Sequence, residues 1–123
     1  MYKILTKAEE QLMQKLWDLK NASVTEIIDT LDEPKPAYNT VSTIIRILEK
    51  KEFVGHEQKG RGYRYFPLID KDTYSRQSAK KMVDTYFEGS FKSMVSFFIK
   101  KKDMDLQELE ELLQQLNNQK DAL

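Results

Sequence analysis

The 123-residue sequence contains no cysteine and a single histidine, His56, and its 20 basic residues balance its 20 acidic ones. Without cysteine there are no disulfides, thiolate metal sites or cysteine nucleophile, and one histidine argues against a metal cage or a serine–histidine relay. No apolar run approaches the roughly 18 residues of a membrane span, and the N-terminus lacks a signal-peptide core. Gly60 and Gly62 flank one arginine, which indicates a hairpin turn and no phosphate loop. We therefore expect a cytoplasmic protein that is not an enzyme, has no cofactor or metal, and does not insert into a membrane.

Two short helices are expected in the first third of the chain. Thr6 and Glu9 have the spacing of a capping box, which predicts a helix start. The apolar residues that follow recur at helical spacing: Leu12, Met13, Leu16 and Trp17. Ser23 and Glu26 repeat the capping pattern and open a second helix, which ends before the two prolines of residues 34–36.

A third helix is expected from about Tyr38 to Lys51, followed by a β-hairpin. Its buried stripe has the spacing i, i+3, i+4, i+7: Val41, Ile44, Ile45 and Leu48. Residues 53–57 and 63–66 are predicted to be strands, and residues 58–62 the turn between them. Three short helices and a hairpin in this order are typical of a winged helix-turn-helix. The sequence thus predicts a mainly α fold with a winged-helix DNA-binding domain over residues 1–70.

The remaining residues, 71–123, are predicted to form a helical dimerisation domain. Helices are expected over about 72–87, around 91–99 after a break at Gly89, and from Asp105 and Glu108 onward. About 50 residues in three helices cannot close a large core alone, and homo-oligomers are mostly two-fold. The alternative is that these helices fold back on the N-terminal domain. The expected dimer contacts are Phe87, Phe91, Met94, Val95, Phe98, Leu109, Leu112, Leu113 and Leu116.

Double-stranded DNA is the partner that the third helix and the hairpin indicate. With the apolar stripe inward, the opposite face carries a polar row without an acid between Tyr38 and Leu48. Residues 37–66 hold six basic and three acidic residues, a local charge of +3 in a neutral chain. Asparagine pairs with adenine and arginine with guanine, whereas hydroxyls and lysines serve phosphates. The expected DNA-binding residues are Tyr38, Asn39, Thr40, Ser42, Thr43, Arg46, Lys50, Lys59, Arg61 and Arg64.

Within that set the roles differ by position. Asn39, Thr43 and Arg46 are expected to read bases, because they lie on the outward face of the third helix. Lys59 and Arg61 stand at the hairpin tip, where a wing reaches the backbone or the minor groove. The others, Arg64 included, are expected to hold phosphates.

Three stretches of the sequence resemble the BlaI/MecI family of penicillinase and methicillin-resistance repressors. Residues 40–54, TVSTIIRILEKKEFV, are similar to that family's recognition helix, and residues 5–17, LTKAEEQLMQKLW, to its first helix. Residues 89–99, GSFKSMVSFFI, with 106–112, LQELEEL, resemble its dimerisation segment. The resemblance implies a homodimeric repressor that binds a palindromic operator. This sequence departs from the family pattern at Ile47, where relatives usually have a basic residue, and at Glu52, where they often have glycine.

The resemblance also implies how repression could end. In the best-known members a membrane sensor responds to a β-lactam, and a sensor-linked protease cuts the repressor within its dimerisation segment. By alignment that cut falls between Phe97 and Phe98, although relatives commonly carry asparagine where Phe97 stands. Other relatives sense copper through a C-terminal cysteine motif, which this chain lacks.

Two alternatives to this function stay open. The first is a winged-helix regulator relieved by a small molecule bound between helices, with Tyr74, Tyr86 and Phe87 lining the pocket. The second is an adaptor whose winged helix binds a protein, which requires an apolar outer face on the third helix.

Overall fold

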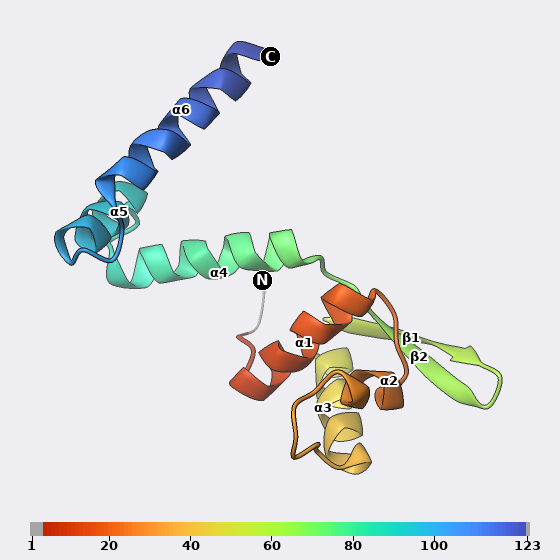
Figure 1. Cartoon of the computed structure of the whole chain (residues 1–123). Coiled ribbons are helices and arrows are strands. Elements are labelled where there is room, and N and C mark those ends of the chain that lie inside the picture. The colour runs from red at the N-terminus through yellow and green to blue at the C-terminus, as the bar shows by residue number, and fades with distance from the viewer. Residues whose placement is uncertain (1–3, 123) are drawn as a thin grey trace. The chain divides into compact units, whose positions relative to one another are not determined.

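The computed structural model describes residues 4–122, which form six helices and one two-stranded antiparallel hairpin (Figure 1). In chain order the elements are α1 Lys7–Leu19, α2 Val24–Asp29, α3 Tyr38–Lys50, β1 Val54–Lys59, β2 Gly62–Pro67, α4 Lys71–Tyr86, α5 Phe91–Lys100 and α6 Leu106–Ala122. The mainly α fold expected from the sequence is confirmed. The chain divides into two compact units, one up to Gln77 and one from Ser78 onward, so the boundary lies inside α4.

The capping box that predicted the start of α1 is present. The Oγ1 of Thr6 accepts a hydrogen bond from the backbone N–H of Glu9 at 3.2 Å, and the Glu9 Oε1 accepts one from the N–H of Thr6 at 2.8 Å. These two bonds satisfy backbone donors that have no partner within the helix. At α2 the Ser23 hydroxyl accepts from the N–H of Glu26 at 3.2 Å, so both short helices begin where the sequence indicated.

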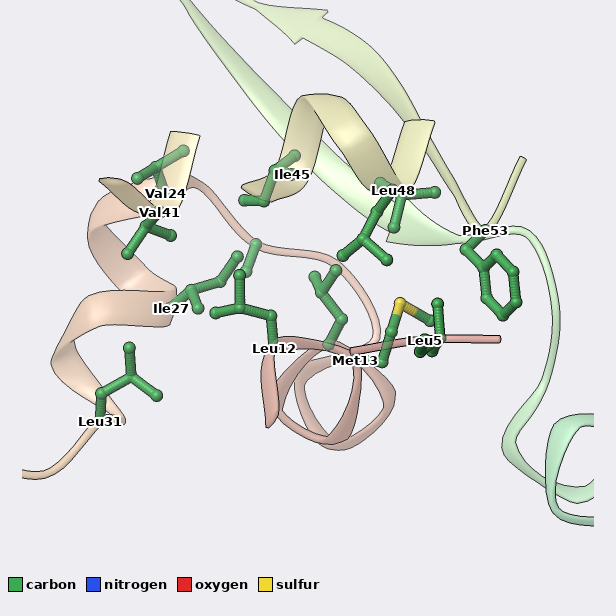
Figure 2. Close-up of a cluster of buried hydrophobic side chains, with 13 residues drawn as sticks. Leu5, Leu12, Met13, Val24, Ile27, Leu31, Val41, Ile45, Leu48 and Phe53 are labelled. Carbon is green, nitrogen blue, oxygen red and sulfur yellow. The ribbon is translucent and has the colours of Figure 1, made fainter. Parts of the chain in front are cut away.

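The first unit is built around one hydrophobic core to which all three of its complete helices contribute (Figure 2). The stripes expected on α1 and α3 face this core together with apolar residues of α2, and Phe53 and Val54, just before and at the start of β1, close it. Ile44 and Trp17 are only half-buried at its edge. The buried members are Leu5, Leu12, Met13, Leu16, Ala22, Val24, Ile27, Leu31, Val41, Ile45, Leu48, Phe53 and Val54.

The hairpin is longer and its turn tighter than the sequence suggested. The register runs from Val54 opposite Pro67 to Lys59 opposite Gly62, which leaves Gly60 and Arg61 as a two-residue turn. Gly60 has φ +61°, a conformation that glycine adopts without strain and that primed hairpin turns require. The expected five-residue turn over 58–62 is therefore wrong, because its outer residues already pair in the ladder.

Backbone hydrogen bonds also tie the hairpin to the segment between α1 and α2. The N–H of Ala22 donates to the carbonyl of Tyr65 at 2.9 Å, and the N–H of Tyr65 donates to the carbonyl of Ala22 at 2.8 Å. This isolated bridge fixes the middle of β2 to the helical body, and Figure 1 shows the hairpin continuing past α2.

The first turns of α4 belong to the first unit and pack against α1 and Phe53. The indole N–H of Trp17 donates to the carbonyl of Ile69 at 2.9 Å. The ring of Tyr74 lies 5.8 Å from that of Trp17 and 5.5 Å from that of Phe53, and its hydroxyl donates to Glu10 at 3.2 Å. Because of these contacts, the first unit extends past Asp70 into α4.

Candidate nucleic-acid interface

The outward face of α3 is polar and exposed to solvent, as its periodicity predicted. Asn39, Thr40, Thr43, Arg46 and Lys50 are all exposed, and no acidic residue occurs in the first turn of the helix. Tyr38, at the N-terminal end, is 57% exposed, and Ser42 is half-buried. The expected set on α3 therefore lies on the solvent side of the helix or at its edge, where a groove of DNA could be met.

One side chain of this face is already engaged with the helix backbone. The hydroxyl of Thr43 donates to the carbonyl of Asn39 at 2.8 Å. Its proton is thus used within the helix, and the methyl group and the oxygen lone pairs remain for a partner. A threonine methyl suits contact with the methyl group of thymine.

Ile47 is the one aliphatic residue of α3 that is strongly exposed, at 41%. A single exposed isoleucine between charged neighbours makes no apolar face, so the adaptor alternative finds no support in α3.

The C-terminal end of α3 is closed by a left-handed residue. Glu52 has φ +65°. The N–H of Glu52 donates to the carbonyl of Glu49 at 3.0 Å, and that of Phe53 to the carbonyl of Leu48 at 2.9 Å. These bonds define a Schellman motif, in which glycine is the usual residue at the position of Glu52. Glu52 thus ends α3 in the left-handed conformation although it is not a glycine.

Two side-chain contacts hold α3 to its neighbours. The ammonium of Lys51 lies 2.7 Å from the buried carboxylate of Glu9. Burial raises the pKa of Glu9, but the hydrogen bonds from Lys51 and Thr6 outweigh it and leave that pKa below its ordinary value. On the other side, the Nδ1 of His56 lies 2.6 Å from the Oε2 of Glu49, which links β1 to the last turn of α3. His56 is therefore engaged in a contact with a carboxylate at the surface.

Four of the six basic residues of segment 37–66 have no carboxylate partner in the described part of the chain. They are Arg46 and Lys50 on α3, and Lys59 and Arg61 at the hairpin tip, and all four are exposed. Cations without an internal partner are available to an anionic ligand. The positive charge that is not neutralised by an internal ion pair therefore lies on α3 and at the tip of the hairpin.

Arg64 differs from these four because its guanidinium is held within the protein. Its Nη1 and Nη2 donate to the two carboxylate oxygens of Glu26 at 2.6 and 3.0 Å, and its Nε donates to the Oδ1 of Asn21 at 2.7 Å. A further bond runs from Nη2 to the carbonyl of Asn21 at 3.3 Å. The bond from Arg64 lowers the pKa of Glu26, and the same bond raises the pKa of Arg64. The phosphate role expected for Arg64 therefore competes with an internal pair.

The turn between α2 and α3 contains a lysine that the sequence analysis did not single out. The ammonium of Lys35 donates to the carbonyls of Ile28, Asp29 and Leu31 at 3.2, 3.3 and 2.7 Å. Carbonyls at the end of a helix lack partners, and a cation placed there satisfies them and complements the helix dipole. Lys35 thus fixes the C-terminal end of α2 just before α3.

The second unit exposes much of its apolar surface. Among residues 78–119 only Val83 is buried, a residue that the sequence analysis missed, and no residue of α5 is buried. The expected dimer contacts Phe91, Leu112, Leu113 and Leu116 are each about half exposed. The other expected contacts are half-buried: Phe87, Met94, Val95, Phe98 and Leu109.

An aromatic groove of about 620 Å³ lies within this unit between α4 and α5. The rings of Phe97 and Phe98 lie 5.5 and 6.3 Å from that of Phe87, and Tyr86 and Met82 complete the apolar lining. Tyr86 and Phe87 are thus placed as the small-molecule alternative expected, but Tyr74 packs in the first unit and does not line the groove.

Two kinds of site are not found in the described residues. No group of three or more histidine, aspartate or glutamate side chains could hold a metal ion there. No helix among residues 4–122 is long and apolar enough to cross a bilayer.

The three helices, the hairpin and the exposed polar face of α3 define a winged-helix protein with a helical C-terminal appendage. The sequence profile of the penicillinase repressors matches residues 5–118. The chain belongs to this family, whose members are transcriptional repressors and not enzymes.

Relatives and solved structures agree with this assignment. The methicillin resistance regulatory protein MecI of Staphylococcus aureus strain N315 is 29% identical over 114 residues, which cover 92% of this chain and 93% of MecI. The solution structure of the DNA-binding domain of the repressor BlaI is 30% identical, with a TM-score of 0.51, and the match covers 60% of this chain and 94% of that domain. The monomeric form of Bacillus licheniformis BlaI in complex with the blaP half-operator is 27% identical, with a TM-score of 0.50, over 60% of this chain and 92% of that one. The winged-helix architecture predicted from the sequence is confirmed.

Proposed function

We propose that this chain is a homodimeric transcriptional repressor that binds a palindromic operator in double-stranded DNA. The observation that carries the proposal is the acid-free outer face of α3, together with cations on α3 and at the hairpin tip that have no carboxylate partner within residues 4–122. The BlaI domain in complex with a half-operator has the same fold. DNA binding also requires the protein to act where the DNA is, in the cytoplasm of the cell.

In this proposal the contacts are divided by position. Asn39, Thr43 and Arg46 read base edges in the major groove, since they lie on the exposed side of α3. The phosphate contacts come from side chains at the helix ends and at the hairpin tip: Tyr38, Thr40, Ser42, Lys50, Lys59 and Arg61. Phosphate contacts set orientation and affinity, whereas base contacts set sequence preference.

The experiment selects bound DNA from a random pool and then measures affinity for the selected sequence against salt. We expect an inverted repeat, because a two-fold dimer presents the same surface twice. If Lys50, Lys59 and Arg61 each neutralise a phosphate, a dimer releases about six counterions and the log–log slope is about −5. Affinity that does not change with salt would contradict the proposal.

Variants test the division of roles. Replacing Arg46 by alanine should cost about 1–3 kcal/mol and relax the preference at one base position of each half-site. Lys59→Ala should weaken binding to every sequence alike and reduce the salt slope. Arg76→Ala removes the same charge from α4, outside α3 and the hairpin, and serves as the control. Equal effects of Arg46→Ala and Arg76→Ala would refute base reading by Arg46.

The dimer is proposed to form through the apolar surface of the second unit. The leucines of α6 and Phe91 of α5 are each about half exposed, and exposed apolar side chains grouped within one unit favour a protein–protein contact. A second copy would cover this surface and the aromatic groove beside it. Sedimentation at micromolar concentration measures the result, and a monomer would refute this part of the proposal.

Relief of repression is proposed to follow from a cut between Phe97 and Phe98 by a sensor-linked protease. That bond lies within α5, and both rings pack on Phe87. Cleavage would divide the helix and separate these anchors, and each large side chain that loses its burial costs about 1.5–3 kcal/mol. A gel of tagged protein from β-lactam-treated cells should show a fragment ending at Phe97. An intact band while the regulated promoter is active would exclude cleavage. A ligand would then be the alternative cause of relief, and the aromatic groove is the site where it would bind.

A further inference from the structure

Arg64 is the most completely bonded side chain near the proposed DNA-binding surface. Its guanidinium makes four hydrogen bonds, two to the carboxylate of Glu26 on α2 and two to Asn21, which follows α1. A guanidinium has five N–H donors in a planar fork, so one donor is left for any other partner. The pair with Glu26 is bidentate, the arrangement that fixes both direction and distance.

These bonds lie at the point where the hairpin meets the helices. The residue after Arg64, Tyr65, exchanges two backbone hydrogen bonds with Ala22. Backbone and side chain together hold the middle of β2 to the α1–α2 segment, and the tip with Lys59 and Arg61 extends beyond this attachment. A two-stranded hairpin has little rigidity of its own, so the direction of the tip depends on its attachment.

We propose that Arg64 is a positioning residue that clamps the hairpin to α2 and so aims the cations of the tip at the DNA backbone. The inference rests on the proposed function and replaces the phosphate contact that the sequence predicted for Arg64, since Arg64 then orders the wing and does not itself contact phosphate. A hairpin held in its binding orientation avoids the entropy of ordering it when DNA binds. Without the clamp, Lys59 and Arg61 keep their charge but lose a fixed position.

The two roles predict opposite effects for one substitution. Glu26→Gln removes the ion pair and one negative charge. If Arg64 is a phosphate ligand, this change frees its guanidinium and tightens DNA binding. If Arg64 is the clamp, the same change loosens the hairpin and weakens binding.

The experiment measures affinity of the full chain for its selected operator in three variants. The clamp predicts that Glu26→Gln and Arg64→Lys each weaken binding about 3- to 10-fold, because lysine keeps the charge but cannot make the bidentate fork. Asp29→Asn is the matched control: it removes one negative charge from α2, and the Asp29 side chain makes no bond in the described residues. It should bind as wild type or tighter. Affinity of Glu26→Gln equal to or tighter than wild type, or wild-type affinity of Arg64→Lys, would overturn the clamp.

A second measurement needs no DNA and reports on the clamp directly. In the free chain, hydrogen exchange at the amides of Lys59 and Gly62, next to the turn, should be at least about 5-fold faster in Glu26→Gln and Arg64→Lys than in Asp29→Asn. Thermal unfolding followed by Trp17 fluorescence confirms that each variant is folded. Should the full chain select no DNA sequence, the proposed function fails, and this exchange experiment alone decides about the clamp. Exchange that is unchanged in both variants overturns it.

Discussion

Glu52 has a backbone conformation that residues other than glycine seldom adopt. Its φ of +65° ends α3 through the two hydrogen bonds of a Schellman motif. The left-handed conformation costs a residue other than glycine about 1–2 kcal/mol. Glycine avoids this cost, but it loses more conformational entropy on folding, which cancels part of the advantage. The motif persists because Phe53 and Leu48, its two hydrophobic members, are both fully buried in the core.

Replacing Glu52 by glycine should therefore raise the free energy of unfolding by about 0.5–1 kcal/mol. Urea unfolding followed by Trp17 fluorescence measures the change. The matched control is Lys50→Gly, two positions earlier in the helical conformation, which should lower stability by about 0.5–1 kcal/mol. If both substitutions destabilise, the left-handed ending of α3 is not a source of strain.

The pair of Glu9 and Lys51 stabilises the fold and makes its stability depend on pH. The carboxylate of Glu9 is 5% exposed and lies 2.7 Å from the ammonium of Lys51. Lys51→Ala leaves that carboxylate buried without its cation and should cost about 1–3 kcal/mol. Lys50→Ala, which removes an unpaired exposed cation, should change stability by less than about 0.5 kcal/mol.

The pH dependence of this pair has a definite sign. The pKa of Glu9 in the folded chain lies below its ordinary value of 4.5. Its contribution is therefore complete above pH 4.5 and is lost as the pH falls through the lower folded-state pKa. In urea titrations, the difference in free energy of unfolding between the wild type and Lys51→Ala should shrink as the pH falls below 4.5. A difference that is constant down to pH 3 would contradict the role of the ion pair.

At the scale of elements, α4 contributes to both compact units. Its first turns carry Tyr74 onto Trp17 and Phe53, and the first unit ends only at Gln77. Tyr74→Ala should destabilise this unit by about 1–3 kcal/mol, because the ring packs against two aromatic neighbours. Thermal unfolding read at Trp17 measures the loss. Arg76→Ala, exposed on the same helix, should leave the melting temperature within about a degree of wild type.

α3 joins the core and the proposed DNA-binding face in one element. Val41, Ile45 and Leu48 are fully buried, and the opposite side carries the polar row. The residues that fix the helix and those proposed to read DNA are therefore different residues of one rigid rod. A substitution on the outer face can alter binding without altering the packing beneath it.

At the scale of the whole molecule, the first unit contains a complete core and the second does not. All 13 buried members of the core cluster lie between Leu5 and Val54, whereas Val83 alone is buried among residues 78–119. The second unit therefore needs a further surface to cover its apolar side chains, which is the physical basis of the proposed dimer.

A fragment ending at Gln77 should fold, sediment as a monomer and bind the operator at least about 100-fold more weakly than the full chain. The loss arises because two linked half-site contacts act through an effective concentration that single domains lack. Sedimentation and operator titration measure the two properties. A fragment ending at Asp70 lacks Tyr74 and should fold with lower stability. Operator affinity of the longer fragment equal to that of the full chain would assign the second unit another role.

Local patterns in the sequence were enough to predict the helices, the caps of α1 and α2 and the polar face of α3. Each of these features depends on residues a few positions apart, as in the Thr6–Glu9 box or the i, i+3, i+4 stripe of α3. The hairpin was predicted for the same reason, although the exact ladder around Gly60 was not, because two-residue and five-residue turns share their residue types.

Tertiary structure alone decided which cations remain available to DNA. Arg64 meets Glu26 across 38 positions of sequence, and Lys51 meets Glu9 across 42. Such pairs depend on the angles at which elements pack, and no periodicity or cap encodes those angles. The sequence therefore determined that positive charge gathers between residues 37 and 66. Packing determined which part of this charge is paired: among the described residues Lys51 and Arg64 meet carboxylates on α1 and α2, whereas Arg46, Lys50, Lys59 and Arg61 have none within salt-bridge distance.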